Sequence, residues 1–186
     1  MLWWVADYPL SDDGRKTALE IADKLSLFSI DKIYSSPLKR AKETAEVIDS
    51  LKRCGITTIL NLKERNSYGV LSGCEKEECK EIYGHLLSDL KNKPGDYYSD
   101  ELVLGAEEKQ VFDKRVEEAL NDIITNALDN GYENVVVVTH SNVTRSIYKN
   151  ILNIKNKIDL DLLATSTIEY QNNIYTLVSN EGVYEG

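Results

Sequence analysis

The chain has 186 residues, of which 42% are hydrophobic, so it can bury one substantial core and we expect a single domain over 1–186. Its formal net charge of −9 repels nucleic acids and anionic membranes, although a few arginines in a cleft could still bind a small phosphorylated substrate at short range. No apolar run approaches the roughly 18 residues of a membrane span, and the opening "MLWWVADYPL" lacks the basic start and apolar core of a signal peptide. We therefore expect a cytoplasmic protein with no nucleic-acid and no membrane partner.

The first third of the chain predicts a helix, a strand and a second helix. Apolar residues recur at helical spacing after "LSDDG", which predicts an amphipathic helix over about 12–27. The short "KIYSS" is typical of a buried strand. Pro37 directly follows Ser36, the pattern of a helix N-cap with proline at the first helical position, so the second helix is expected to begin there. This turn from strand to helix would place Ser36 and Arg40 at the carboxyl edge of a sheet.

The middle of the chain predicts one more strand and an insertion. "TTILNL" at 57–62 is rich in β-branched residues and predicts a strand. The polar "KERNSYGVLSG" that follows predicts a loop, and functional residues are common in loops. Residues 75–91 predict a helix and 92–104 an irregular stretch. We therefore expect residues 66–104 to form a small cap insertion.

The last third predicts a long helix, a buried strand and an edge hairpin. Apolar spacing predicts a helix over about 106–129, with Val111 among the residues that face inward. Four consecutive valines in "NVVVVTH" are typical of a strand covered on both faces, and this strand ends at His140. "SNVTRSIYKNIL" then predicts a helix whose first backbone amides lie near that histidine. Alternating residues around Asn172-Asn173 predict two antiparallel strands joined by a two-residue turn.

The alternation of strands and helices predicts an α/β fold, a three-layer α/β/α sandwich with a mostly parallel central sheet. In such folds ligands bind outside the carboxyl ends of the strands. Arg40, Glu64 and His140 all fall at those ends, so we expect their side chains to meet there.

Five segments together resemble the histidine phosphatase superfamily, the phosphoglycerate mutase-like fold, in its smaller branch. "DYPLSDDGRKTALEIADKL" resembles the family's segment with Pro-Leu and a glycine that opens the first long helix, and "IYSSPLKRAKETAEVI" resembles its Ser-x-x-x-Arg-Ala-x-x-Thr-Ala signature. "NLKERNSYGVLSG" resembles the loop that carries an acidic residue ahead of a glycine, and "LGAEEKQVFDKRV" is similar to a degenerate Gly-Gly-Glu-Ser segment. "VVVVTHSNVTRSI" resembles the second-histidine motif, with Ser141 where glycine is usual. The five segments occur in the family's order over most of the chain.

The resemblance implies a phosphomonoester hydrolase that binds a small phosphorylated molecule or inorganic phosphate and needs no metal or organic cofactor. A first histidine would attack phosphorus and form a phosphohistidine. Arg40 would bind phosphoryl oxygens, His140 would donate a hydrogen bond to a non-bridging oxygen, and Glu64 would protonate the leaving oxygen. Supporting candidates for phosphate binding are Ser36, Asn142, Glu107 and Arg145.

The family's hallmark, an Arg-His-Gly at the end of a first strand, does not occur in this sequence, whose only histidines are His85 and His140. Three explanations stay open. The sequence could begin at an internal methionine and lack that strand, which would leave a gap in the sheet that a second copy could fill as a homodimer. The protein could be a catalytically dead pseudophosphatase that serves as a phosphate-binding or protein-interaction module. Or His85 could replace the nucleophile from the cap. A mutase is a further alternative, and it needs the same histidine.

Cysteine and histidine spacing does not predict a metal site. Cys74, Cys79 and His85 are one ligand short of a structural zinc site and lack its usual tight spacing, so we expect no bound metal. Three cysteines cannot all pair internally, and we expect reduced thiols rather than a disulfide framework.

Overall fold

The structure is a computed structural model, and it describes residues 7–73, 81, 84 and 104–186. Nearly all of the predicted helix over 75–91 and of the irregular stretch 92–104 lies outside the described residues. The cap insertion over 66–104 therefore stays a prediction.

A parallel sheet forms the centre of the molecule. Its strands are β1 (Lys32–Ser35), β2 (Ile56–Thr58) and β3 (Val135–Val138), in the order β2-β1-β3. Strand β1 is the middle strand, and the side chains of Ile33 and Tyr34 are buried on its two faces. The strands are only three or four residues long, and the segments that follow their carboxyl ends contain Ser36, Glu64 and His140.

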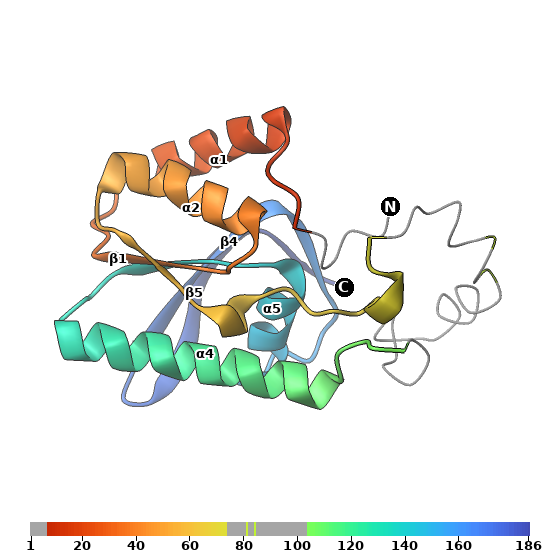
Figure 1. Cartoon of the computed structure of the whole chain (residues 1–186). Helices are drawn as coiled ribbons and strands as arrows, with labels where there is room; N and C mark the ends of the chain where they lie inside the picture. Colours follow the sequence, from red (N-terminus) through yellow and green to blue (C-terminus); the bar gives the residue numbers. More distant parts are fainter. Residues whose placement is uncertain (1–6, 74–80, 82–83, 85–103) are drawn as a thin grey trace.

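Helices cover both faces of this sheet (Figure 1). Helices α1 (Asp12–Leu25) and α2 (Lys39–Lys52) lie on one face, and the long helix α4 (Lys109–Asn130) runs along the other. The predicted α/β/α sandwich with a mostly parallel central sheet is confirmed.

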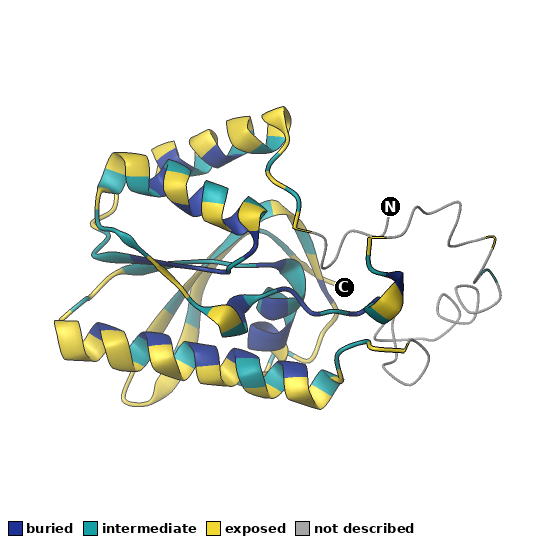
Figure 2. Cartoon of the chain, viewed as in Figure 1, coloured by how far each residue is buried: buried dark blue, intermediate teal, exposed yellow. Residues whose placement is uncertain are grey.

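Each face of the sheet has its own apolar cluster. Between the sheet and the first two helices, Ala22, Ile33, Ala45 and Ile48 pack together. On the opposite face, the cluster consists of Tyr34, Leu62, Phe112, Val116, Ala119, Ile123, Val143 and Ile147. In Figure 2, helices α1, α2 and α4 are dark on the side that faces the sheet and yellow on the outer side.

The inner face of α4 differs from the predicted one at its start. Val111 is 55% exposed, whereas the next residue, Phe112, is buried and begins the stripe that continues with Val116 and Ala119. The helix also begins at Lys109 rather than at residue 106. The apolar stripe follows the residues three and four positions apart from Phe112, so Val111 falls outside it.

Two predicted boundaries near the sheet edge are wrong. Helix α2 begins at Lys39 with Leu38 as its N-cap, so Ser36 is not the cap. The predicted strand over 57–62 is replaced by the three-residue β2 and a 3-10 helix, η1 (Leu60–Leu62). The tight turn of η1 carries the chain from the end of β2 toward the loop that holds Glu64.

The C-terminal part forms a second, antiparallel sheet of two strands, β4 (Ile158–Gln171) and β5 (Ile174–Glu185). Asn172 and Asn173 join them with φ angles of 53° and 62°. Two consecutive residues with positive φ are the geometry of a type I′ turn, so the predicted two-residue turn is confirmed. No helix among the described residues has the length and apolar character needed to cross a membrane.

Candidate active site

The carboxyl ends of the three parallel strands meet at one edge. The backbone N–H of Ser36 donates to the carbonyl of Val138 at 2.9 Å, and the N–H of Ile59 donates to the carbonyl of Ser35 at 2.9 Å. The ends of β1, β2 and β3 are thus held side by side. The residues that follow these ends supply the predicted site.

Strand β3 ends at Val138 rather than at His140 as predicted, and His140, two residues beyond it, is the N-cap of α5 (Ser141–Ser146). The predicted position of His140 beside the first backbone amides of a helix is confirmed. The side chain of His140 is buried, and Nε2 lies 2.7 Å from the hydroxyl oxygen of Ser36, which has no exposed surface. The same hydroxyl accepts a hydrogen bond from the backbone N–H of Leu38 at 3.3 Å. Ser36 therefore orients the His140 ring instead of capping α2.

The environment of His140 keeps its imidazole neutral. Burial, followed by the positive charges of Arg40 and Arg115, lowers the pKa of His140 from 6.5 to about 3. A neutral imidazole has one N–H donor and one acceptor nitrogen. His140 therefore offers a hydrogen bond without adding a charge.

Glu64 is buried beside the start of α5. Its Oε1 accepts a hydrogen bond from the backbone N–H of Arg65 at 2.9 Å, and its Oε2 accepts from the Ser141 hydroxyl at 3.3 Å and from the Asn142 N–H at 3.4 Å. Burial raises the pKa of Glu64, and the hydrogen bonds and the charge of Arg40 oppose this shift. A raised pKa favours the protonated carboxyl that an acid catalyst requires near neutral pH.

Arg40 is the second residue of α2 and is half-buried. Its positive charge acts on both Glu64 and His140, so these three residues form one electrostatic cluster. Burial lowers the pKa of Arg40, while the charges of Glu64 and Asp7 oppose that shift. A half-buried guanidinium at a sheet edge has the charge and planar shape that bind phosphoryl oxygens.

The supporting candidates occupy different places. Asn142 lies at the cluster through its backbone N–H, and its side-chain oxygen accepts a hydrogen bond from Arg145 Nη1 at 3.5 Å. Glu107 lies at the start of α4, where both of its carboxylate oxygens bind Arg115. Glu107 and Glu64 line a common cavity of about 310 Å³. The predicted contact of Glu107 with phosphate stays a prediction.

Sequence reasoning missed Arg115 and Arg65. Arg115 donates hydrogen bonds to the carbonyls of Asn61 and Lys63 at 2.7 Å, and Arg65 is buried directly after Glu64. One signal was present in the sequence: Arg115 stands three residues after Phe112, next to the apolar stripe of its helix. A cation at such a position needs a buried partner.

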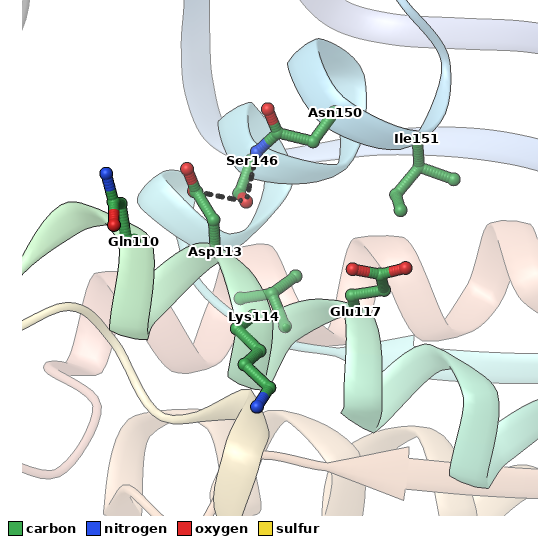
Figure 3. Close-up of a pocket in the computed structure, with 8 residues that line it drawn as sticks. Gln110, Asp113, Lys114, Glu117, Ser146, Asn150 and Ile151 are labelled. Carbon is green, nitrogen blue, oxygen red and sulfur yellow. Dashed lines mark hydrogen bonds between the residues drawn. The ribbon is translucent and has the colours of Figure 1, made fainter.

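A second cavity, of about 340 Å³, lies between α4 and the segment formed by α5 and the π-helix η3 (Ile147–Ile151). Figure 3 shows that the Ser146 hydroxyl donates to Asp113 at 2.8 Å and accepts from Asn150 Nδ2 at 3.1 Å. The described residues that line this cavity include none of the predicted site residues. The hydrogen bond between Ser146 and Asp113 joins α5 to α4, whereas the one from Asn150 lies within the segment formed by α5 and η3.

In the part of the chain that the structure describes, no group of three or more His, Cys, Asp or Glu side chains could hold a metal ion. Cys74, Cys79 and His85, the three residues weighed for zinc, lie outside the described residues.

Three curated relatives share sequence with this chain. An uncharacterized phosphatase, PhoE, from Bacillus subtilis (strain 168) is 40% identical over 77 residues, which are 41% of this chain and 39% of the relative. Phosphoglycerate mutase-like protein 4 from Arabidopsis thaliana is 33% identical over 147 residues, which are 77% of this chain and 60% of the relative. A metal-independent phosphoserine phosphatase from the same plant is 33% identical over 144 residues, which are 76% of this chain and 58% of the relative. The chain thus spans between 39% and 60% of the length of these relatives.

Solved structures share the fold, and a family model matches the sequence. A phosphoglycerate mutase from Bacillus anthracis str. Sterne has a TM-score of 0.77 at 23% identity, covering 94% of this chain and 82% of that one. An alpha-ribazole phosphatase from Shigella flexneri has a TM-score of 0.77 at 20% identity, covering 94% of this chain and 85% of that one. The model of the histidine phosphatase superfamily (branch 1) matches residues 3–181. This match over nearly the whole length shows that the chain belongs to the histidine phosphatase superfamily.

Proposed function

We propose that this chain is a phosphomonoester hydrolase that acts on a small phosphorylated molecule at the carboxyl edge of its parallel sheet. The observation that carries the proposal is the cluster of Glu64, His140 and Arg40, in which a buried carboxyl with a raised pKa stands beside a neutral histidine and a half-buried arginine. Two relatives bear the name of a phosphatase, and one of these is described as metal-independent. That description agrees with a site that works with side chains alone.

Each residue of the cluster has a distinct role in this proposal. Arg40 binds two phosphoryl oxygens, and the N–H of His140 donates to a third oxygen as negative charge develops on it. Glu64 transfers its proton to the leaving oxygen as the bond from phosphorus to that oxygen breaks and the attacking nucleophile forms its own bond to phosphorus. The alcohol then leaves neutral, and Glu64 becomes a carboxylate.

The proposal assigns phosphate binding and protonation of the leaving group to described residues. His140, which the proposal assigns to charge stabilisation, is the one histidine among the described residues, and His85 lies outside them. The phosphorus-attacking histidine that the family resemblance implies is therefore not assigned to a described residue. The proposal rests on the binding and acid groups, which can be tested separately from the nucleophile.

The test compares hydrolysis of p-nitrophenyl phosphate and phenyl phosphate in the presence of a metal chelator. Phenolate is the poorer leaving group and depends more on the acid, so Glu64→Gln should slow phenyl phosphate hydrolysis by about 10²-fold or more and p-nitrophenyl phosphate hydrolysis by less. Arg40→Ala should abolish turnover of both esters. Lys42→Ala, an exposed change on the same helix, should leave both rates unaltered.

Equal loss with both esters in Glu64→Gln would contradict the acid role. No turnover by the unaltered chain, with phosphate still bound, would contradict hydrolysis and would favour a phosphate-binding pseudophosphatase.

A further inference from the structure

Arg115 in helix α4 forms a partly buried ion pair with Glu107 and donates hydrogen bonds to backbone carbonyls of the loop that carries Glu64. We propose that Arg115, held in place by Glu107, is a positioning residue that fixes the backbone of residues 61–66 and thereby sets where the Glu64 carboxyl points. The acid role of Glu64 rests on the proposed function, whereas the hydrogen bonds between Arg115 and the loop do not.

Arg115 binds the backbone of the loop directly. Its Nη1 donates to the carbonyls of Asn61 and Lys63, both at 2.7 Å, and its Nη2 donates to the carbonyl of Glu64 at 3.3 Å. Three carbonyls within four residues thus share one guanidinium. The donors come from the middle of a regular helix, so they hold the loop against a rigid element.

Glu107 holds the guanidinium from the other side. Arg115 Nε donates to Glu107 Oε1 at 2.6 Å, and Nη2 donates to Oε2 at 2.8 Å. The Arg115 side chain is only 16% exposed, and its guanidinium carbon lies 4.7 Å from the centre of the Phe112 ring. Every nitrogen of the guanidinium is therefore engaged. A lysine has one nitrogen and could not make these contacts at once.

The backbone around Glu107 holds the other end of the loop. Its carbonyl accepts hydrogen bonds from Arg65 Nε at 3.2 Å and Nη2 at 3.0 Å, and its N–H donates to the Asn66 carbonyl at 2.7 Å. Oε2 of Glu107 also accepts from the Asn66 N–H at 3.3 Å. The two residues after Glu64 are thus fixed by side-chain and backbone contacts to one acidic residue.

Gly69 shows how closely the segment before α4 approaches this loop. A Cβ atom at Gly69 would lie 2.2 Å from the Leu104 carbonyl oxygen and 2.5 Å from the Ala106 nitrogen, and its φ angle is +47°. The N–H of Val70 donates to the same Leu104 carbonyl at 2.9 Å. The hydrogen bonds of Glu107 thus continue a close backbone contact between residues 69–70 and residues 104–106.

The hydrogen bonds from Arg115 to the loop also determine how firmly the Glu64 carboxyl is held. Its oxygens are 2.9 Å, 3.3 Å and 3.4 Å from their donors, so the two longer contacts already lie at the outer limit of a hydrogen bond and are easily lost. In the proposal, loss of Arg115 from the carbonyls of residues 61–64 lets the loop move outward, so that water reaches the carboxyl. The Glu64 carboxyl would then be less buried, and its orientation would be less well fixed.

The experiment compares Arg115→Lys and Arg115→Met with Lys114→Met, an exposed change one residue away. The pKa of Glu64 is measured in the full chain by carbon-13 NMR of labelled glutamate, and its signal is assigned with Glu64→Gln. The groups that face Glu64 are the Arg65 and Asn142 amides, the Ser141 hydroxyl and the charge of Arg40, and all of them are retained in these variants. Exchange of the Arg65 amide hydrogen gives a second readout.

Both Arg115 variants should lower the pKa of Glu64 toward that of an ordinary glutamate, and the Arg65 amide should exchange about tenfold faster or more. Lys114→Met should change neither. A lower melting temperature with unchanged Glu64 pKa and Arg65 exchange would overturn the proposal, because it would show a merely structural role. If Arg115→Met does not fold, Arg115→Lys and Glu107→Gln give the same readouts. None of these measurements needs turnover, so they remain decisive if hydrolysis is not observed.

Discussion

Two buried residues at the sheet edge have pKa shifts in opposite directions, and burial is the largest cause of both. Burial disfavours the charged form of each group, so it lowers the pKa of His140 and raises that of Glu64. The result is a neutral imidazole beside a carboxyl that holds its proton more tightly than usual. The hydrogen bond between Ser36 and His140, and the one that the Asn142 N–H donates to Glu64, keep both groups in place.

Ser36→Ala should destabilise the protein by about 1–3 kcal/mol, because it removes the hydroxyl partner of the buried His140 ring. Chemical denaturation measures this change in the free energy of unfolding. Ser50→Ala is the matched control: its hydroxyl binds the Val47 carbonyl at the surface, and the change should stay within about 0.5 kcal/mol. Equal changes in the free energy of unfolding for the two substitutions would show that the contact between Ser36 and His140 does not stabilise the protein more than a surface hydrogen bond does.

Among the elements, α2 matters most for the site, because Arg40 stands in its first turn. The helix ends at Lys52, and its C-cap residue, Arg53, has a φ angle of 54°, in the left-handed region. A residue with a Cβ atom is strained there, and glycine is the usual occupant of such helix ends.

Arg53→Gly should therefore stabilise the protein by about 0.5–1 kcal/mol, even though it removes a side chain. The same substitution at Lys42, an exposed position inside the helix, should destabilise it by roughly 1 kcal/mol. Thermal unfolding of both variants checks the prediction. A loss of stability in Arg53→Gly would mean that the left-handed conformation carries no relievable strain.

At the scale of the whole molecule, stability depends on pH through the buried site. The lowered pKa of His140 contributes stability that is fully present above pH 6.5 and is lost as the pH falls toward about 3. The raised pKa of Glu64 acts in the opposite sense, since its contribution is present below 4.5 and is lost as the pH rises through its folded-state value. Above pH 4.5, where both groups titrate, the stability gained from His140 with rising pH is partly offset by the stability lost from Glu64.

Replacing His140 with glutamine should make the free energy of unfolding fall less steeply as the pH is lowered from 6.5, because the group that must gain a proton on unfolding is gone. Denaturant titrations at several pH values, with the unaltered chain as reference, measure both slopes. Identical slopes would contradict a buried neutral His140.

The order of residues within each segment predicted most of the helices and strands. The features that it did not predict depend mainly on contacts between residues that are far apart in sequence. The valine strand and the helix that begins directly after His140 follow from residues that are adjacent in sequence. The start of α2 was wrong because the Ser36 hydroxyl is directed to His140, which is 104 positions away. Arg115 was missed because its partners at Asn61 and Lys63 lie 54 and 52 positions away. The homodimer stays a prediction, which sedimentation in solution would check.

The central claim is that Arg40, His140 and Glu64 form a phosphate site, and calorimetric titration of inorganic phosphate tests it most directly. The unaltered chain should bind phosphate, Arg40→Met should lose measurable binding, and Lys42→Met should retain it, because Lys42 carries the same charge on the same helix but is exposed. Equal affinity in Arg40→Met and in the unaltered chain, or no binding by the unaltered chain, would contradict the account.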